Sequence, residues 1–361
     1  MPETITTAQP VAIGIDTHKD THHVAVITTM GEPVEDFTIP ATAAGYTKAI
    51  AAIGIYDSVE AVGIECTGTY GANITKAFLE AGYLVYEVNR PNRFARRRQG
   101  KTDQFDAYHA AEAVLSHRTT AIAKARNGFV EALRPLHAFR RLAVKNRSAE
   151  LNHLQALLVS APENIKAAYQ PLSAAQRLKA LVDADPSSFT DTIEQEAMYV
   201  LKLAAERIQR AHAEIKDLEK RITNLLRQYT PQLLDIYGAG PDTIAQLLLT
   251  VGDNPERFYS EAGFAALTGV CPIPASSGRT NRHRLNRGGD RQANRALHTT
   301  TLVRMRHDQR TKDYVARRTA EGKTTKEIQR CLKRAIAREM FREIRDALNQ
   351  LNNHPQLAES L

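Results

Sequence analysis

The chain has 361 residues, a net charge of +8 and a hydrophobic content of 43%, which allows a buried core and predicts two or three domains. No run of 18 apolar residues occurs, so we expect no membrane-spanning helix. The polar, acidic N-terminus predicts no signal peptide. Cys66, Cys271 and Cys331 lack metal-ligand spacing, so we expect reduced thiols and a cytoplasmic location.

Positive charge is concentrated in two segments. From Cys271 to Ile344 there are 19 Lys and Arg residues against 7 Asp and Glu, a balance of +12, so the remainder is close to −4. A second cluster, from Arg90 to Lys101, carries six positive charges and no acid. Two basic segments favour a polyanionic partner, most simply nucleic acid, although an arginine-rich solvated surface would have the same composition.

The first third of the chain alternates short apolar runs with amphipathic segments. We expect strands over 11–16, 22–28, 35–40, 59–65 and 83–88, and helices over 41–54, 71–82 and 102–117. The polar segment THKDT between the first two strands predicts a hairpin. Gly82 is a typical helix C-cap and Thr102 a typical helix N-cap. This order of elements predicts an α/β domain with a mixed sheet.

Four acidic residues occupy ends of these elements. Asp16 ends the first predicted strand, Glu65 ends the fourth, and Asp103 and Asp106 share one face at the start of a helix. Strand-end acids gather at the carboxyl edge of a sheet, and four carboxylates there would repel one another without a cation. Mg²⁺ or Mn²⁺ suits carboxylates and phosphate. Each acid alone has an ordinary alternative, as a turn residue or as a partner of the helix dipole.

The middle of the chain is polar and helical. A long helix is expected over 130–161, kinked or begun near Pro135. From Leu201 a heptad pattern follows, with one seam position at Leu201, Ile208, Ile215 and Ile222 and a second at Ala204, Ala211, Leu218 and Leu225. This pattern predicts a coiled coil or a long antiparallel hairpin, and the later heptads lean toward a parallel pair that would serve as a dimerisation arm. The alternative is an amphipathic helix that packs on its own domain.

The last third contains a glycine turn and basic helices. Gly238 to Pro241 resembles the hairpin of helix-hairpin-helix proteins, where backbone N–H groups hold a phosphate, but a plain Gly-Pro link is equally consistent with it. Basic amphipathic helices are expected over 291–307 and 324–351. Between them and the glycine turn lies IPASSGRTNRHRLNRGGDR (273–291), which by itself indicates a flexible basic turn.

Several motifs resemble those of DEDD transposases of bacterial insertion sequences, namely insertion-sequence family one-ten, the bridge-RNA-guided recombinases. They are GIDTHKD, GIECTGTYG and RRQGKTDQFDAYHAA in the first half and GAGPDTIAQLL, FAALTGVCPIPASSG and RGGDRQANRAL in the second. The resemblance covers nearly the whole chain. It implies an RNase H-like, RuvC-type domain over 1–124, a helical or coiled-coil linker over 125–230, and a small, mainly helical transposase domain over 231–361.

The resemblance also implies functional residues. Asp16, Glu65, Asp103 and Asp106 would be the metal-binding acids, and Ser277, directly before Gly278, would be the nucleophile, with Ser276 as its rival. A serine hydroxyl needs a base, a metal or strong electrostatic help; His283 is a candidate base, although a phosphate or structural contact suits it better. The residues expected to contact nucleic acid are Arg93, Arg96, Arg97, Arg98, Lys101, Gly238, Gly240, Arg279, Arg282, Arg284, Arg287 and Arg291.

Three functions are consistent with this sequence. The leading one is a bacterial transposase and site-specific DNA recombinase that works as a dimer or tetramer. It would use Mg²⁺ and a phosphoserine intermediate, and the resemblance implies guidance by a structured non-coding RNA that pairs with donor and target DNA. The second is a metal-dependent nuclease of the Holliday-junction resolvase type, with water as nucleophile. The third is a non-catalytic nucleic-acid-binding protein, against which the four intact acids argue.

Overall fold

The chain forms two compact units, which are described separately. The computed structural model describes residues 10–88, 102–119, 121–276, 283–284 and 286–353. The N-terminal unit comprises the chain up to Gly128 together with Val251–Gly263, and the C-terminal unit comprises Phe129–Thr250 and Phe264–Leu361. This division differs from the predicted one, because the helical middle and the C-terminal domain form a single unit and 251–263 joins the N-terminal unit. Among the described residues, no helix is long and apolar enough to span a bilayer.

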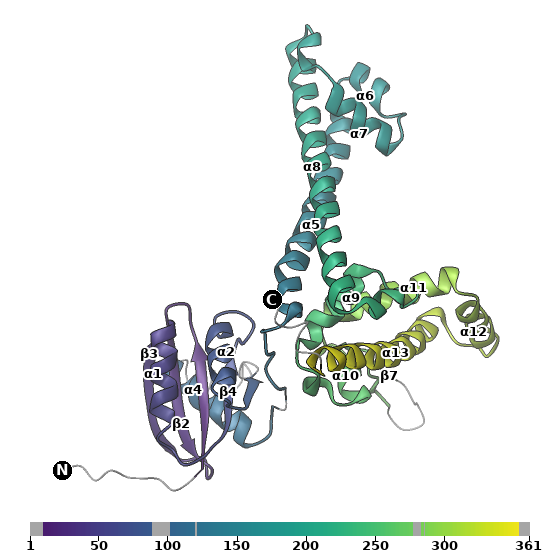
Figure 1. Ribbon diagram of the computed structural model, residues 1–361. Coiled ribbons are helices and arrows are strands. Elements are labelled where there is room, and N and C mark those ends of the chain that lie inside the picture. Colours follow the sequence, from purple (N-terminus) through teal and green to yellow (C-terminus); the bar gives the residue numbers. More distant parts are fainter. Residues whose placement is uncertain (1–9, 89–101, 120, 277–282, 285, 354–361) are drawn as a thin grey trace. The chain divides into compact units, whose positions relative to one another are not determined.

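The N-terminal unit is built on a five-stranded sheet (Figure 1). Its strands are β1 (Val11–Thr17), β2 (Thr21–Thr28), β3 (Pro33–Pro40), β4 (Val59–Glu65) and β5 (Val85–Val88). They lie in the order β3-β2-β1-β4-β5, with β1–β2 and β2–β3 antiparallel and β1–β4 and β4–β5 parallel. This is the mixed sheet expected from the sequence, and it is compatible with an RNase H-like domain.

Helices cover both faces of the sheet. They are α1 (Ala43–Ile53), α2 (Ala72–Glu80) and α4 (Asp103–Leu115). Val11, Ile13 and Ile15 of β1 belong to the same buried cluster as residues of α1 and α2. The alternate residue Ala12 instead lies with Ala111 of α4, because successive side chains of a strand point to opposite faces. The Thr102 hydroxyl accepts a hydrogen bond from the backbone N–H of Phe105, which confirms the predicted N-cap.

The edge strand β5 is covered by segments that the sequence did not reveal. Residues 121–123 run along it, with backbone hydrogen bonds from Glu87 N to Ala121 O and from Ala123 N to Val85 O. The side chain of Asn254 donates to the carbonyl oxygen of Ala123 and accepts from the N–H group of Ala125. In the 3₁₀ helix η3 (Pro255–Phe258), Arg257 donates to the carbonyl of Ile122. Such pairing satisfies backbone groups that an open edge strand would leave exposed, and it explains why 251–263 belongs to this unit.

In the C-terminal unit, α5 (Phe129–Ser160) and α8 (Thr192–Tyr229) form a long antiparallel hairpin, here called the arm (Figure 1). At one end Phe129 stacks on Tyr229 with ring centroids 5.1 Å apart. Toward the other end Leu154 and Leu158 pack on residues of α8 such as Ile208. That end also carries α6 (Glu163–Tyr169), α7 (Ala174–Asp183) and the short η1 (Pro186–Ser188).

The heptad seam of α8 is buried within the chain. Leu201, Ile208, Ile215 and Ile222 are between 0 and 6% exposed, and α8 packs along α5. The structure therefore has an antiparallel hairpin within one chain, one of the predicted alternatives, where the residue types had leaned toward a parallel pair. α5 begins ahead of Pro135 and contains it.

The rest of the C-terminal unit is a small helical domain with one short hairpin. Its elements are η2 (Pro231–Asp235), α9 (Pro241–Val251), α10 (Glu261–Leu267), β6 (Ile273–Pro274), β7 (His283–Arg284), α11 (Arg291–His307), α12 (Gln309–Ala320) and α13 (Thr325–Asn353). The last residue of α9 and the first three of α10 fall within the N-terminal unit's segment Val251–Gly263. Phe264 contacts Phe341 with centroids 6.1 Å apart, and α11 packs on α13. α11 has the predicted limits, whereas α12 was not predicted.

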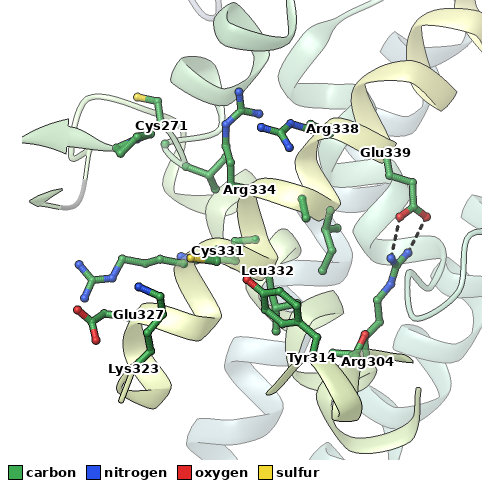
Figure 2. A pocket seen from close by; sticks show the side chains of 18 of the residues that line it. Cys271, Arg304, Tyr314, Lys323, Glu327, Cys331, Leu332, Arg334, Arg338 and Glu339 are labelled. Carbon is green, nitrogen blue, oxygen red and sulfur yellow. Dashed lines mark hydrogen bonds and ion pairs between the residues drawn. The ribbon is translucent and has the colours of Figure 1, made fainter. Parts of the chain in front are cut away.

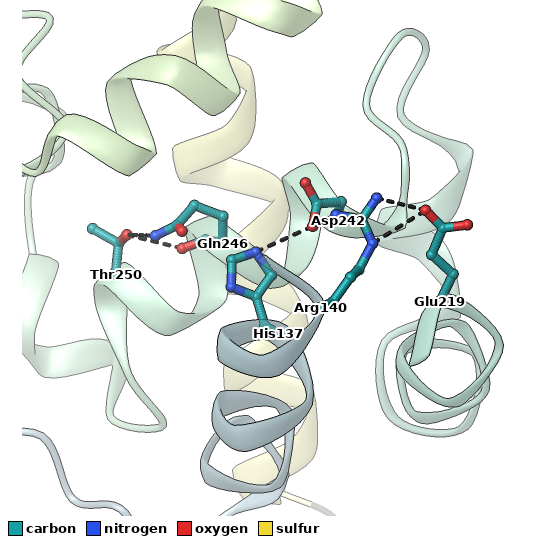
Figure 3. A network of polar contacts seen from close by, with 6 residues as sticks. All are labelled: His137, Arg140, Glu219, Asp242, Gln246 and Thr250. Carbon is teal, nitrogen blue, oxygen red and sulfur yellow. Dashed lines mark hydrogen bonds and ion pairs between the residues drawn. The ribbon is translucent and has the colours of Figure 1, made fainter. Parts of the chain in front are cut away.

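A polar network joins the base of the arm to α9 (Figure 3). Arg140 of α5 donates to Asp242 of α9 at 2.7 Å and to Glu219 of α8, and the Nε2 atom of His137 lies 3.3 Å from the same Asp242 oxygen. Burial by itself would raise the pKa of Asp242, but the hydrogen bond from His137 and the charges of Arg140 and Arg295 lower it. Asp242 therefore stays ionised and holds α9 against the arm.

Candidate metal centre and nucleic-acid interface

A close approach of α4 to β1 brings Asp103 to Asp16. Gly14 lies so near the helix that a Cβ atom there would be 2.0 Å from the carbonyl oxygen of Ala107. Asp16 is two residues beyond Gly14 and so points to the same face of the sheet. Asp103 is one helical turn before Ala107 and so lies on the same side of α4. The sequence GID therefore places its acid beside the first turn of the helix.

The same arrangement recurs on the neighbouring strand. A Cβ atom at Gly63 of β4 would be 2.5 Å from the carbonyl oxygen of Ala110. Glu65 follows Gly63 by two residues, and Asp106 precedes Ala110 by one helical turn. The sequence GIE therefore directs Glu65 toward the turn of α4 that carries Asp106, as GID directs Asp16 toward the turn that carries Asp103.

The two strands are in register at this edge. Ile15 of β1 pairs with Ile64 of β4 in parallel, so Asp16 and Glu65 leave the sheet side by side. The hydroxyl of Thr17 donates to the carbonyl oxygen of Glu65 at 3.0 Å and ties the strand ends together. Asp16, Glu65 and Asp106 are between 2 and 5% exposed. All four predicted acids therefore lie at one corner of the N-terminal unit.

The turn after Glu65 is tight and unusual. Cys66 has a φ of 53°, a left-handed conformation that is costly for a residue with a Cβ atom. Its carbonyl oxygen accepts hydrogen bonds from the N–H groups of Thr69 and Gly71. This conformation lets the chain turn directly from the buried carboxylate into α2.

The charges at this corner favour a cation. Burial raises the pKa of Asp16, and the nearby carboxylates of Asp106 and Asp103 raise it further, while His18 opposes the shift. Like charges in a partly desolvated site destabilise one another until a cation is bound. Hard carboxylate oxygens are the ligands of Mg²⁺ and Mn²⁺, so the residues present fit a divalent ion of this class.

Histidine 18 completes the cluster and was missed in the sequence. Its Nε2 atom lies 3.0 Å from Asp16 Oδ2 and 3.1 Å from Asp103 Oδ1, and the three ligand atoms lie within 4.8 Å of one another. The sequence signal was available, because His18 directly follows the end of β1 in the hairpin GIDTHKD. The pattern by itself predicts only a turn residue at this position.

A second missed residue, Asp36 of β3, fixes the position of α4. It accepts hydrogen bonds from His23 of β2 at 2.8 Å and from Gln104 and Tyr108 of α4 at 2.7 and 3.1 Å. Burial alone would raise the pKa of Asp36, but these hydrogen bonds lower it. The ionised carboxylate therefore holds the N-terminal half of α4, and with it Asp103 and Asp106, against the sheet.

The predicted serine loop begins and ends at a short hairpin in the C-terminal unit. Ile273 pairs with Arg284 and Pro274 with His283. Ser276 is described and exposed. Ser277, Arg279 and Arg282 lie outside the described residues, as do Arg93, Arg96, Arg97, Arg98 and Lys101 of the first basic cluster.

The motif RGGDRQANRAL at the end of the loop is fixed by packing and capping. A Cβ atom at Gly289 would be 2.3 Å from the backbone nitrogen of Gly269, so the two segments pass backbone to backbone. Asp290 caps α11 by accepting from the N–H groups of Gln292 and Ala293. The side chain of Asn294 donates to the carbonyl oxygens of Thr268 and Gly269. These contacts fix the segment that leads out of the loop.

A basic groove of about 1450 Å³ lies beside this hairpin (Figure 2). Nine Lys and Arg residues line it against three acids; the basic residues are Arg284, Arg304, Arg310, Lys323, Arg330, Lys333, Arg334, Arg338 and Arg342. This excess of positive charge suits a phosphate backbone. Among the residues expected to contact nucleic acid, Arg284 lines this groove, while Arg287 and Arg291 are exposed nearby in sequence.

Some of the groove's cations have structural partners, and Arg304 and Lys333 are two of them. Arg304 makes two hydrogen bonds of 2.7 Å to Glu339 and donates to the carbonyl oxygen of Tyr237. Lys333 is buried and donates to Asn294 at 3.0 Å. Burial, with a smaller contribution from Arg330, lowers the pKa of Lys333. Exposed arginines such as Arg310 and Arg342 are better placed to meet a ligand.

At the glycine turn before α9, the carboxylate of Asp242 would compete with a bound phosphate. Gly238 has a φ of +79° and Gly240 has open space around it, as the predicted phosphate-binding turn requires. However, Asp242 occupies the first turn of α9, where a carboxylate already complements the positive end of the helix dipole. A phosphate at this turn would have to approach that carboxylate.

Two sequence families match this chain. Residues 13–161 match the DEDD transposases of the IS110 type, and residues 231–316 match a family described as transposase IS116/IS110/IS902. The first match contains the four acids and the second contains the serine loop.

Two proteins of insertion elements are similar in sequence to this chain. The chain is 33% identical over 151 residues to an uncharacterized 43.6 kDa protein of insertion element IS110 from Streptomyces coelicolor, covering 41% of this chain and 37% of that protein. It is 25% identical over 362 residues to an uncharacterized 42 kDa protein of insertion element IS900 from Mycobacterium paratuberculosis, covering 88% and 91%. Both halves of the chain thus point to one group of proteins, and the chain belongs to the IS110 family of transposases.

Proposed function

We propose that this transposase is a site-specific DNA recombinase that cleaves and rejoins DNA through a covalent bond to Ser277. The observation that carries the proposal is the corner at which Asp16, Glu65, Asp103 and Asp106 gather around the close packing of α4 on β1 and β4. Four carboxylates in one partly buried site suit a divalent cation and a phosphodiester. The match of the second half of the chain to IS110-type transposases supports a second functional centre around the serine loop.

In the proposed reaction the oxygen of Ser277 forms a bond to a DNA phosphorus. The bond from that phosphorus to a deoxyribose oxygen breaks, and the serine proton is transferred to balance the charge on the leaving oxygen. Strand exchange reverses the step with a different deoxyribose oxygen, which regenerates the serine. Asp16, Glu65, Asp103 and Asp106 would hold Mg²⁺ or Mn²⁺, which when bound supplies positive charge that stabilises the developing charge on phosphate.

Arginine side chains would supply the remaining electrostatic stabilisation. The loop carries Arg279 and Arg282, and the groove beside its hairpin adds Arg284, Arg310 and Arg342. Guanidinium groups bind phosphate oxygens in a bidentate way and remain charged at any physiological pH. We therefore propose that the groove holds a nucleic-acid backbone next to the serine loop.

We also propose that a structured non-coding RNA pairs with donor and target DNA and selects the sites. Positive charge on both halves of the chain supports a large polyanionic partner. Base pairing would then read the sequence while the protein holds backbone and shape.

The test is a covalent adduct between protein and DNA. The intact chain is incubated with Mg²⁺, DNA that carries the ends of the element, and RNA transcribed from the non-coding sequence beside the gene, and is then denatured. We expect a protein–DNA adduct in the wild type and in Ser276→Ala, and none in Ser277→Ala. Asp16→Asn and Asp103→Asn should lower its rate of formation by about 100-fold or more, as expected when charge stabilisation of a transition state is lost.

Circular dichroism on each variant checks that a loss of activity is not a loss of folding. DNA cleavage that survives Ser277→Ala and leaves no adduct would instead identify a metal-dependent nuclease with water as nucleophile. An adduct that forms equally well without RNA would contradict the guided mechanism.

A further inference from the structure

His18 lies between two carboxylates in the acidic corner of the N-terminal unit. It lies in the hairpin between β1 and β2, where its backbone N–H donates to the carbonyl oxygen of Thr21 at 3.0 Å and closes the turn. This contact, two residues after the buried Asp16, fixes the direction in which the side chain leaves the sheet. The imidazole bridges a carboxylate of β1 and a carboxylate of α4.

The separations match those within a coordination shell. Nε2 lies 3.0 Å from Asp16 Oδ2 and 3.1 Å from Asp103 Oδ1. Ligand atoms that lie about 2.1 Å from an octahedral ion, at right angles to each other, are about 3.0 Å apart. The contacts seen here thus hold Nε2 at this spacing from one oxygen of each carboxylate, and the three atoms lie within 4.8 Å of one another.

The chemistry of the donor set bears on which ion is chosen. Four carboxylates alone suit hard ions such as Mg²⁺, whereas an imidazole nitrogen favours transition-metal ions, with affinities that rise from Mn²⁺ to Co²⁺. A neutral imidazole whose proton is on Nδ1 leaves the Nε2 lone pair available to the ion.

We infer that His18 is a ligand of the catalytic metal ion and shifts the preference of the site from Mg²⁺ toward Mn²⁺ and Co²⁺. This inference rests on the proposed metal-dependent function and adds a nitrogen donor to its four acids. It makes His18 a determinant of metal selectivity rather than a turn residue.

The test is spectroscopic and needs no activity. Mn²⁺ is added to the intact chain, and electron spin echo envelope modulation reports whether a ¹⁴N nucleus is bound directly to the ion. We expect ¹⁴N modulation in the wild type and its loss in His18→Gln, whose side-chain amide keeps a hydrogen-bonding group near the Nε2 position. Titration calorimetry should show Co²⁺ affinity reduced about tenfold or more in His18→Gln, because loss of even an outer-shell partner costs that much, with a smaller change for Mg²⁺.

A matched control is available on the neighbouring strand. His23 pairs with Asp16 in the β1–β2 register, but its imidazole bonds Asp36 and Thr38 instead. His23→Gln should therefore keep the ¹⁴N modulation. Asp16→Asn should abolish Mn²⁺ binding at the site and so shows that the signal comes from this corner.

The possible failures are distinct. Mn²⁺ that binds in an Asp16-dependent way without ¹⁴N modulation, or with modulation unchanged in His18→Gln, overturns the role of His18 and leaves the four-acid site intact. A wild-type chain that binds no Mn²⁺ or Mg²⁺ overturns both the inference and the metal site on which it rests.

Discussion

Two glycines determine where the acids of this transposase lie. Gly14 and Gly63 each precede an acidic residue by two positions, and each lies beneath the backbone of α4. The absence of a side chain lets the helix approach the sheet, and the two-residue strand repeat then points Asp16 and Glu65 toward its first turns. In the motifs GID and GIE, the glycine therefore allows α4 to pack closely, and the acid provides the carboxylate.

The first prediction concerns Gly14→Ala. The new Cβ atom would be 2.0 Å from Ala107 O and 2.3 Å from Ala111 N, and backbone atoms there cannot yield without moving the helix. We expect the free energy of unfolding of the N-terminal unit to fall by about 1–3 kcal/mol, as overpacking usually costs, and Mn²⁺ affinity to fall with it. Urea denaturation and calorimetry measure the two effects.

The control is Gly68→Ala in the turn that follows Glu65. Its Cβ atom would be 3.5 Å from the guanidinium of Arg126, an ordinary contact. This variant should keep the stability and metal affinity of the wild type. A Gly14→Ala protein as stable as the control would show that the close packing of α4 does not matter.

At the scale of elements, the arm shows how one pattern allows several structures. A heptad repeat indicates that one face of α8 is apolar, but it does not predict which surface covers that face. In the structure α5 covers it, with the polar network of Arg140, Glu219 and Asp242 at the base. The seam thus serves the fold of a single chain, and assembly through the arm remains a prediction.

The second prediction distinguishes these roles of the seam. Ile208 is fully buried in the arm, and Ile208→Ala should lower the free energy of unfolding by about 2–5 kcal/mol. Because the partner surface belongs to the same chain, the urea midpoint should not change when protein concentration is varied about 100-fold, unlike that of an obligate dimer.

Ile193→Ala is the control on the same helix, since Ile193 is 72% exposed. Its effect should stay within about 0.5 kcal/mol. A midpoint that rises with concentration in the wild type, and less so in Ile208→Ala, would mean that the seam pairs two chains.

At the scale of the whole molecule, charge and chemistry are divided between the two units. The acidic corner belongs to the N-terminal unit, and the basic groove with the hairpin of the serine loop belongs to the C-terminal unit. In the proposed reaction, the cation site would serve the reacting phosphate and the arginines would hold the flanking backbone.

The third prediction tests the groove as a phosphate site. Arg284, Arg310 and Arg342 line it and are exposed. Replacing all three with alanine should weaken nucleic-acid binding and reduce the slope of log K against log salt by about 0.7–0.9 per lost phosphate contact. Fluorescence anisotropy with labelled duplex and RNA across a salt series measures this slope.

The matched control replaces Arg207, Arg210 and Arg221, which are exposed on α8 of the arm. It removes the same charge and should leave the slope nearly unchanged. An unaltered slope in the groove variant would exclude these arginines as phosphate contacts.

The sequence by itself determined the order of elements in the first third of the chain, the mixed sheet and the positions of the four acids along the chain. These features depend on local patterns: apolar runs of strand length, helical spacing, and caps such as Thr102. The motifs, among them GID, GIE and RGGDRQANRAL, also sufficed to predict the family. Ser277 and the first arginine cluster rest on the sequence alone.

Other features depend on contacts between residues far apart in the sequence, and only the tertiary structure shows them. Only the packed chain shows that α5 covers the heptad seam, that Val251–Gly263 joins the N-terminal unit through Asn254 and Arg257, and that Asp36 holds α4. The same is true of His18, whose bond to Asp103 spans 85 positions of the chain. A local pattern specifies which face of an element is apolar or charged, but the partner of that face is set by the free energy of the whole packed chain.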